Sequence, residues 1–576
     1  MCGIAGIVNF NNKKIENDFI EKTLKSLNHR GPDSKGSWIS KCKTSMLCNT
    51  RLAIIDPLLR SNQPIISNDD RFVIVFNGEI YNFQEIKKKL KDFKFKTNGD
   101  TEVILYSYIK YGKNCVKLFD GIFSFVIFDK ISKKLFCSRD PFGIKPLYYF
   151  INKDFFFFAS EIQTLFLHKQ IKKEVNYRSV NSYLSSEYYE NIKKTFFKKI
   201  NKLKPGNYLE LQNKKIKEVE YWNFFEKCEK TFVPKNQNEK KELLKFLVKN
   251  SVKKSLVSDT KISVAASGGL DSSILQNIAK SKLKTKPELF SFFFENTKYS
   301  EQNYVKNLSK NQNINVKYQR ITPDLFLKYY KEVMSCCEEP MAGLPIISYY
   351  LALKKLNVSK VILDGSGIDE CHFGYEKYLS IKKNSFILSQ DNSHSIHKNI
   401  IHENLKSNFQ NYDNEIDFNH YKKNYQNLMY KDLFYIKLPR ALRFRDRIGM
   451  SNGIEIRPSF LDKDLIPFMF KLDKNDHFRD GHQKFLLRSV FSSDINQKII
   501  FSKKRNIQTP QSEWFKKDLK PWLDKKLKNS NIWDYKIFNK KIFLEKYNEF
   551  QDGKLNNSFF IWKFINLENF ISQNKN

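Results

Sequence analysis

Short apolar segments separated by turn-forming residues run through the first 210 positions of the chain. They lie at residues 121–128, 135–138, 147–151 and 155–159. Runs of about four to eight residues with such boundaries are typical of β-strands, and their close succession predicts an antiparallel meander. The run at 155–158 is entirely phenylalanine and indicates a buried strand.

A second pattern begins near residue 241. Helical periodicity there alternates with single apolar strands at residues 262–266, 288–294 and 360–363, and a helical tail follows residue 515. Such alternation favours a parallel sheet covered by helices. Because 576 residues exceed what one hydrophobic core organises, we expect two domains. The turn signal at 204–206 and the polar stretch after it place them at 1–210 and 241–576, with a linker over 211–240.

The chain is strongly basic. Its 100 Lys and Arg residues outnumber 62 Asp and Glu residues and give a formal net charge of +38. Such a charge is a feature of proteins that bind nucleic acid or acidic membranes. The lysines are scattered and long arginine clusters are missing, so a composition bias is the favoured interpretation. We expect no nucleic-acid partner, and an RNA-directed protein is the alternative from a different functional class.

Cysteine usage and hydropathy indicate the compartment. Nine cysteines, an odd number without a C-x-x-C pair, favour a reducing environment. No apolar run reaches the roughly 18 residues of a membrane span. No basic segment precedes the apolar start of the chain, which argues against a signal peptide. A cytoplasmic protein is expected.

Cys2 directly follows the initiator methionine. Removal of Met1 would leave Cys2 with a free α-amine, and an amine that titrates near about 7.7–8 is a suitable base for a thiol of pKa about 8.5. One residue would then supply both nucleophile and base. The alternative is a cysteine that merely lies near a chain end.

Six short motifs in order favour the first interpretation. They are CGIAG at 2–6, HRGPD at 29–33, RLAIID at 51–56, NGEIYN at 77–82, GDTE at 99–102 and RDPFGIKPLY at 139–148. Together they resemble the class II glutamine amidotransferase domain, an N-terminal-nucleophile hydrolase. The resemblance implies an αββα sandwich that binds L-glutamine, with Cys2 attacking the γ-amide.

The same resemblance implies roles for individual residues. The Asn77 side chain and the Gly78 N–H would form the oxyanion hole. Arg51 would bind the α-carboxylate of glutamine and Asp100 its ammonium, for which a surface ion pair is the alternative. The remaining residues expected to bind glutamine are Leu52, Ile54, Ile55 and Glu79.

The second half carries a Gly/Ser loop, SVAASGGLDSS at 263–273, between an apolar strand and a helical pattern. A loop of this kind that opens a helix cradles anions. No lysine follows the glycine pair, so it is not a Walker A loop. It resembles the pyrophosphate loop of ATP pyrophosphatases, which cleave ATP between the α and β phosphates. The implied ATP-binding residues are Ala265, Ser267, Gly268, Gly269, Asp271, Ser272 and Phe294, together with Asp364 and Gly365 of a second loop.

That second loop, VILDGSGIDE at 361–370, follows a predicted strand. Asp271 and Asp369 are candidate Mg²⁺ ligands, because Mg²⁺ prefers carboxylate oxygens beside phosphates. With FGY at 373–375 and KFLLR at 484–488, the match to asparagine synthetases extends over about residues 1–515. It implies catalytic roles for Ser366 and Glu370, and for Lys484 in stabilising charge on the adenylate and pyrophosphate.

The fold class implied is mixed α/β, with the αββα sandwich followed by a Rossmann-like ATP-pyrophosphatase domain. The activity implied is ATP-dependent amidation of L-aspartate through β-aspartyl-AMP, with ammonia passing through an internal tunnel and a homodimer as the assembly. Asp364 and Ser366 depart from the family loop S-G-E/D-G, which puts the acceptor in question. The alternative is another carboxylate, such as a uronic acid on a nucleotide sugar.

Overall fold

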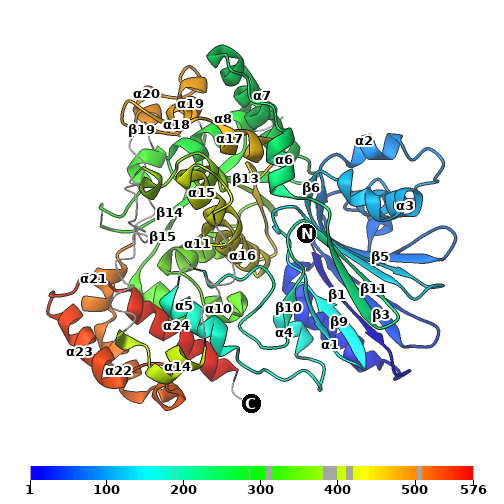
Figure 1. The fold of residues 1–576 in the computed structure, drawn as a ribbon, viewed down its shortest axis with the longest axis horizontal. Helices are drawn as coiled ribbons and strands as arrows, with labels where there is room; N and C mark the ends of the chain where they lie inside the picture. Colours follow the sequence, from blue (N-terminus) through cyan, green and yellow to red (C-terminus); the bar gives the residue numbers. More distant parts are fainter. Residues whose placement is uncertain are drawn as a thin grey trace.

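Two six-stranded antiparallel sheets form the amino-terminal half in the computed structural model (Figure 1). The structure describes residues 2–186, 188–283, 286–296, 298–306, 314–379, 399–409, 419–502 and 509–574. The first sheet has the order β10 (Asn201–Lys202), β8 (Tyr148–Ile151), β9 (Phe155–Ala159), β1 (Cys2–Asn9), β3 (Ser45–Arg51), β2 (Ser34–Ile39). The second has the order β12 (Lys215–Glu220), β11 (Asn207–Gln212), β7 (Leu135–Arg139), β6 (Gly121–Asp129), β5 (Phe72–Ile80), β4 (Ile65–Ile66).

The two sheets pack face to face, which confirms the predicted αββα sandwich. Alternate residues of β1, such as Ile4 and Val8, share a core with Val73 and Val75 of β5. The outer face of the first sheet is covered by α1 (Asn17–Leu27) and α4 (Ile162–Leu165). The outer face of the second is covered by α2 (Phe83–Lys88) and α3 (Asp100–Tyr111).

The predicted strands are present, but the meander is wrong. Residues 121–128 and 135–138 form a hairpin in the second sheet, whereas 147–151 and 155–159 form a hairpin in the first. The connection between the hairpins crosses from one sheet to the other at Asp140, whose carboxylate accepts hydrogen bonds from the backbone N–H groups of Phe142, Ile144 and Lys145. Apolar periodicity within strands carries no information about this crossing.

The carboxy-terminal half is built on a five-stranded parallel sheet, as predicted. Its order is β15 (Val316–Arg320), β14 (Glu288–Phe293), β13 (Ile262–Ala265), β16 (Val361–Asp364), β17 (Glu455–Pro458). In chain order this is 3-2-1-4-5, so the direction of winding reverses between β13 and β16, where such sheets bind ligands beyond the carboxyl ends of their strands. One face is covered by α7 (Gln237–Ser255) and α8 (Leu270–Lys282), and the other by α10 (Pro323–Cys337), α11 (Leu344–Lys355) and α16 (Lys437–Met450).

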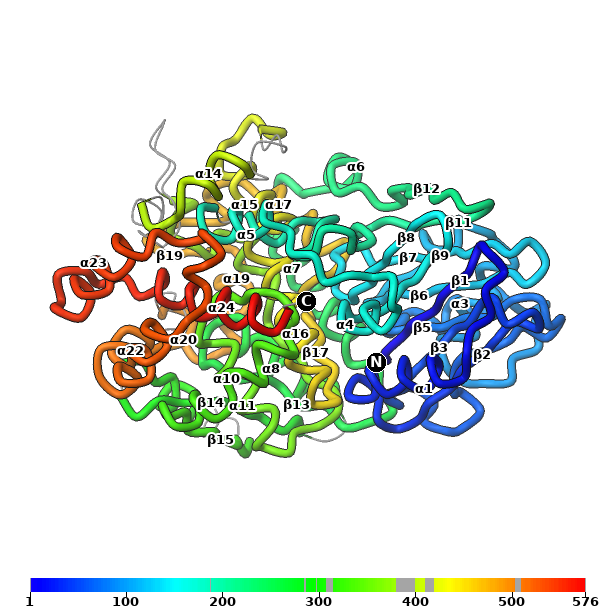
Figure 2. Tube along the Cα trace, turned by 90° about the horizontal axis from the view of Figure 1, so that it is seen from below, coloured from blue at the N-terminus to red at the C-terminus, as the bar shows by residue number. Residues whose placement is uncertain are grey.

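The remaining elements are mostly short helices that surround this sheet. They are α5 (Tyr177–Ser185), α6 (Phe224–Lys230), α12 (Ile368–Cys371), α14 (Glu403–Asn408), α15 (Asn424–Phe434), α17 (Leu465–Lys471), α18 (Lys474–His477), β18 (Phe478–Arg479), β19 (His482–Gln483), α19 (Phe485–Val490), α20 (Gln497–Ile500) and α21 (Gln511–Lys516). The helical tail predicted after residue 515 is α22 (Lys520–Asn529), α23 (Lys540–Gln551) and α24 (Phe559–Gln573). Helices α22 and α23 lie at the end remote from the β-sandwich in both views, and α24 runs back towards the middle of the molecule (Figures 1 and 2).

The segment expected as a linker, residues 211–240, has regular structure. It contains β12 at the edge of the second sheet, helix α6 and the first turn of α7. Helix α5 of the amino-terminal half packs against the carboxy-terminal half, where Tyr183 donates a hydrogen bond to the carbonyl of Met341 at 2.9 Å. None of the described helices has both the length and the apolar character needed to cross a membrane.

Candidate active site

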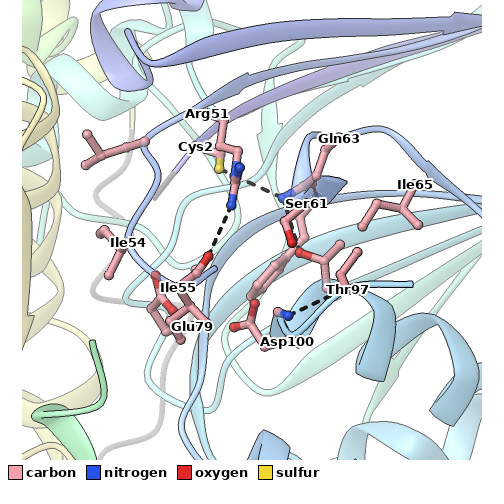
Figure 3. Close-up of a pocket in the computed structure, with 15 residues that line it drawn as sticks. Cys2, Arg51, Ile54, Ile55, Ser61, Gln63, Ile65, Glu79, Thr97 and Asp100 are labelled. Carbon is pink, nitrogen blue, oxygen red and sulfur yellow. Dashed lines mark hydrogen bonds between the residues drawn. The ribbon is translucent and has the colours of Figure 1, made fainter. Parts of the chain in front are cut away.

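A pocket of about 360 Å³ opens at the start of β1 (Figure 3). Cys2 lies opposite Arg51 in the register of β1 and β3, and β5 passes beside them. Eight of the nine residues expected at this site line the pocket, namely Cys2, Arg51, Leu52, Ile54, Ile55, Gly78, Glu79 and Asp100; the ninth, Asn77, lies behind the lining. Sequence motifs spread over 100 positions are thus brought to one cavity.

Asn77 lies beside Cys2 and has an unsatisfied donor. The backbone nitrogen of Cys2 donates to Asn77 Oδ1 at 3.1 Å. Asn77 is fully buried, and its Nδ2 has no hydrogen-bond partner among the residues that the structure describes. An unpaired buried N–H₂ group is costly, so a ligand oxygen at this point would be bound favourably. The arrangement suits a negatively charged oxygen that develops next to the Cys2 thiol.

Gly78, the next residue of β5, needs to be glycine. Its φ of +145° lies in a region that side chains avoid, and a Cβ would lie 2.0 Å from the carbonyl oxygen of Ile122. The close pairing of β5 with β6 therefore depends on this residue. Backbone without a side chain is left facing the pocket.

Arg51 and Asp100 are both 5% exposed, and each has hydrogen-bond partners other than the other. Arg51 Nη2 donates to the carbonyls of Ile55 and Asp56 at 3.1 and 2.6 Å, so the guanidinium is held by neutral groups. Asp100 Oδ2 accepts the Ile80 N–H at 2.9 Å, and burial raises the pKa of Asp100 to about 6. Because both residues are buried, the alternative interpretation of Arg51 and Asp100 as a surface ion pair does not hold.

Gln63 is a pocket residue that the motifs did not indicate. Its Nε2 lies 4.0 Å from Cys2 Sγ and 3.3 Å from Thr101 Oγ1, while its Oε1 accepts the Phe76 N–H at 2.6 Å. A loop glutamine outside any motif gives no sequence signal. The other lining residues not expected from the sequence are Ser61, Ile65, Phe76, Thr97, Gly99 and Thr101.

A second pocket, of about 540 Å³, lies where β13 runs into α8. The helix begins after Gly269 and has Asp271 in its first turn, with lysines in its last turn. Gly268 has a φ of +66°, and a Cβ there would lie 2.7 Å from Tyr304 Cβ. The lining residues are Ser267, Gly269, Leu270, Asp271, Ser272, Glu301, Gly374, Gln483, Lys484, Arg488 and Ser502.

Lys484 joins the two acidic candidates at this pocket. Its Nζ lies 2.5 Å from Asp271 Oδ2 and 2.5 Å from Asp369 Oδ1. Burial opposes the charge on Lys484, but the two carboxylates outweigh it and hold the pKa above its ordinary value. Asp271 Oδ1 is buried and has no hydrogen-bond partner in the described part of the chain. Two carboxylates beside a phosphate loop fit Mg²⁺, which usually completes its octahedron with water and phosphate oxygens.

The second loop lies against the first, as the winding of the sheet requires. A Cβ on Gly365 would be 3.5 Å from Asp271 Cβ. The Asp364 carboxylate accepts the Ser366 N–H at 2.9 Å and the Ser366 hydroxyl, and Arg445 Nε lies 3.0 Å from its other oxygen. Arg445 of α16 is a partner for Asp364 that sequence reasoning missed.

Glu370 and Phe294 lie deeper than the pocket lining. Tyr375 Oη donates to Glu370 Oε1 at 2.7 Å, and burial with the nearby Asp369 charge raises the pKa of Glu370 to about 7. Phe294 packs edge-on against Trp514 in the core, with ring centroids 5.8 Å apart. Ala265 ends β13, directly before the phosphate loop.

Buried ion pairs join the two halves of the chain. Arg30 Nη1 lies 2.9 Å from both Glu161 and Asp446, and Arg447 Nη1 lies 3.0 Å from Glu161. Arg30 belongs to the HRGPD motif, which sequence reasoning left without a role. The motif therefore fixes the amino-terminal half onto α16 of the carboxy-terminal half.

Comparison with known families gives two matches that divide the chain. Residues 1–222 match the family described as glutamine amidotransferase domain. Residues 243–572 match the family described as asparagine synthase.

Curated relatives match over most of the chain. Asparagine synthetase (glutamine-hydrolyzing) 1 of Bacillus subtilis is 27% identical over 633 aligned residues, covering 99% of this chain and 97% of the relative. Asparagine synthetase (glutamine-hydrolyzing) 2 of the same organism is 31% identical, and the match covers 87% of this chain and 70% of the relative. A putative asparagine synthetase of Methanocaldococcus jannaschii is 33% identical, and the match covers 67% of this chain and 78% of the relative. Among solved structures, glutamine phosphoribosylpyrophosphate amidotransferase of B. subtilis is 14% identical over 65% of this chain and 77% of its own, with a TM-score of 0.30, too low to support a functional inference.

Proposed function

The chain belongs to the asparagine synthetase family, an enzyme class that uses glutamine and ATP to form amides, and from that premise we propose that it amidates L-aspartate through β-aspartyl-AMP. AMP, pyrophosphate and glutamate would be the other products. The proposal depends most on one observation. A single chain carries a cysteine beside an unsatisfied buried amide in one pocket and a phosphate loop beside Lys484 in another.

In the first pocket, Cys2 would attack the γ-amide of glutamine after Met1 is removed; Met1 lies outside the described residues. The α-amine that processing frees would take the thiol proton. Asn77 Nδ2 and the Gly78 N–H would bind the oxyanion, with Arg51 and Asp100 holding the α-carboxylate and ammonium of glutamine. The apolar wall of Leu52, Ile54 and Ile55 and the carboxyl of Glu79 complete the site.

In the second pocket, the loop at 266–269 and the start of α8 would hold the phosphates of ATP. A carboxylate oxygen of the acceptor would attack the α-phosphorus, and Lys484 would stabilise the charge that develops there. Asp271 and Asp369 would hold Mg²⁺, which supplies charge neutralisation on the phosphates when bound. Ser366 and Glu370, from the second loop and α12, would act on the acceptor side of the same centre.

We assign the release of ammonia to the amino-terminal domain and the synthetase reaction to residues 241–576. Ammonia must stay unprotonated to react, so passage through the buried contact between the halves would protect it. All nine cysteines are free thiols, which supports the cytoplasm as the place of action.

The identity of the acceptor is tested by supplying ammonia in place of glutamine. Aspartate is expected to support AMP and pyrophosphate formation, while UDP-hexuronates do not. The Asp364–Arg445 pair favours aspartate as the acceptor, since a carboxylate and a guanidinium side by side match the ammonium and the α-carboxylate of an amino acid. Turnover with a UDP-hexuronate and none with aspartate would show that the acceptor is the sugar acid and not aspartate.

Glutamine hydrolysis is expected to depend on the ionisation of Asp100. Because burial raises its pKa to about 6, the carboxyl is neutral below that pH and no longer pairs with the glutamine ammonium. The kcat/KM of the wild type, divided by that of Asp100→Asn, should be constant above about pH 7 and fall about tenfold per pH unit below 6. Taking the ratio cancels any pH effect that the two proteins share. A ratio that does not change between pH 5 and 8 would contradict this role.

A further inference from the structure

Arg488, in the second pocket, is a buried cation without an acidic partner. It belongs to α19, is 5% exposed, and forms no ion pair within the described part of the chain. Its Nε donates to the Gln483 carbonyl at 2.6 Å and its Nη1 to the Ile500 carbonyl. Two carbonyls fix the direction of the guanidinium but do not neutralise it.

The nearest acid cannot serve as that partner. Burial lowers the pKa of Arg488, and the charge of Asp271 only partly offsets this. Asp271 already pairs with Lys484. A buried guanidinium is costly without a counter-charge, so the geometry leaves room for an anion that arrives with a ligand.

Gln483 adds a second unsatisfied donor to the same wall. Gln483 is 9% exposed, and its Nε2 is buried without a hydrogen-bond partner among the described residues. Gln483 is the last residue of β19, and Lys484 follows it directly at the start of α19. Gln483 and Arg488 therefore present an amide and a guanidinium to one cavity.

The opposite wall is the phosphate loop. Ser267, Gly269 and Ser272 line the cavity at the start of α8, a 13-residue helix whose first-turn backbone N–H groups lie at this end. Figure 1 shows α8 and α19 at the same end of the carboxy-terminal half. An elongated anion with several phosphate groups would satisfy both walls at once, whereas a single phosphate would satisfy one.

We propose that Arg488 and Gln483 grip the terminal diphosphate of ATP and hold it as pyrophosphate after it leaves, an inference that rests on the proposed adenylation. When the acceptor oxygen bonds to the α-phosphorus, the bond from that phosphorus to the α,β-bridging oxygen breaks, and its electron pair leaves with pyrophosphate. The negative charge on the leaving group increases in this step. A guanidinium fork and an amide at that end bind the product-like charge more tightly than the substrate.

The test compares how variants bind the two products. Arg488→Gln removes the charge, Arg488→Lys keeps it without the fork, and Gln483→Leu removes only the amide. Arg479→Gln, an exposed arginine on β18, is the matched control. Inhibition constants of inorganic pyrophosphate and of AMP are measured against ATP in ammonia-dependent synthesis, with glutamine hydrolysis reporting an intact fold.

Arg488→Gln should weaken inhibition by pyrophosphate by about 10- to 100-fold and Gln483→Leu by about 5- to 10-fold, with inhibition by AMP changed less than about threefold. Arg479→Gln should match the wild type. Pyrophosphate inhibition that is unchanged in Arg488→Lys, Arg488→Gln and Gln483→Leu would overturn the inference. Variants in which only the inhibition by AMP becomes weaker would also overturn it. If the wild type makes ADP, the proposed adenylation itself fails, a result separate from these.

Discussion

Replacing Cys2 by alanine is expected to lower glutamine-dependent synthesis by at least about 1,000-fold and to leave ammonia-dependent synthesis within about twofold of the wild type. The thiol is the proposed nucleophile for the amide, and among the described residues no other sulfur lines that pocket. The second pocket shares no lining residue with the first, so ammonia supplied from solution bypasses the loss. Both rates are measured as amide formed per minute at saturating ATP and acceptor.

Cys42→Ala is the matched control for this variant. Cys42 is exposed, and hydrogen bonds from the Ser40 and Thr44 hydroxyls lower its pKa to about 7, so it is a reactive thiol remote from the pocket. Its replacement should leave both activities unchanged. If Cys2→Ala lost both activities equally, the two-site scheme would be contradicted, as it would be by active protein that still carries Met1.

Replacing Lys484 by asparagine is expected to reduce AMP formation by about 1,000-fold with either nitrogen source, while glutamine hydrolysis persists. Asparagine suits the left-handed backbone of Lys484, whose φ is +56°, so the change removes the ammonium without straining the chain. The ammonium is the group held between Asp271 and Asp369. AMP and pyrophosphate are quantified in the presence of acceptor and ammonia.

Loss of the ammonium also leaves two partly buried carboxylates close together without a counter-charge, and their like-charge repulsion destabilises the fold. The double variant Lys484→Asn with Asp271→Asn removes one of those charges and should restore the melting temperature without restoring AMP formation. Recovery of activity in the double variant would show that Lys484 serves stability alone.

The sequence predicted local structure and part of the lining of each pocket, because the motifs identify which backbone and side-chain groups occur in order along the chain. Gly78 and Gly268 are examples, since a positive φ together with a close neighbour admits few other residues. The parallel sheet followed from alternating patterns, and with it the meeting of the loops after β13 and β16.

Residues outside motifs could not be assigned in this way. Gln63 reaches Cys2 from a loop, Arg445 reaches Asp364 from a helix, and Asp446 reaches Arg30 across the contact between the halves. Each of these contacts joins positions far apart in the chain, and apolar periodicity is silent about such pairs. The distribution of the hairpins between two sheets was missed for the same reason.

The division of labour between the pockets is tested most directly by following the nitrogen itself. The enzyme is given glutamine labelled with ¹⁵N in its side-chain amide, ATP and aspartate, and the products are read by ¹⁵N NMR and nucleotide chromatography. Label in the side-chain amide of asparagine, with one AMP and one pyrophosphate formed per amide, is the expected result. Label that remains as ammonium while no amide forms, or the appearance of ADP in place of AMP, would contradict it.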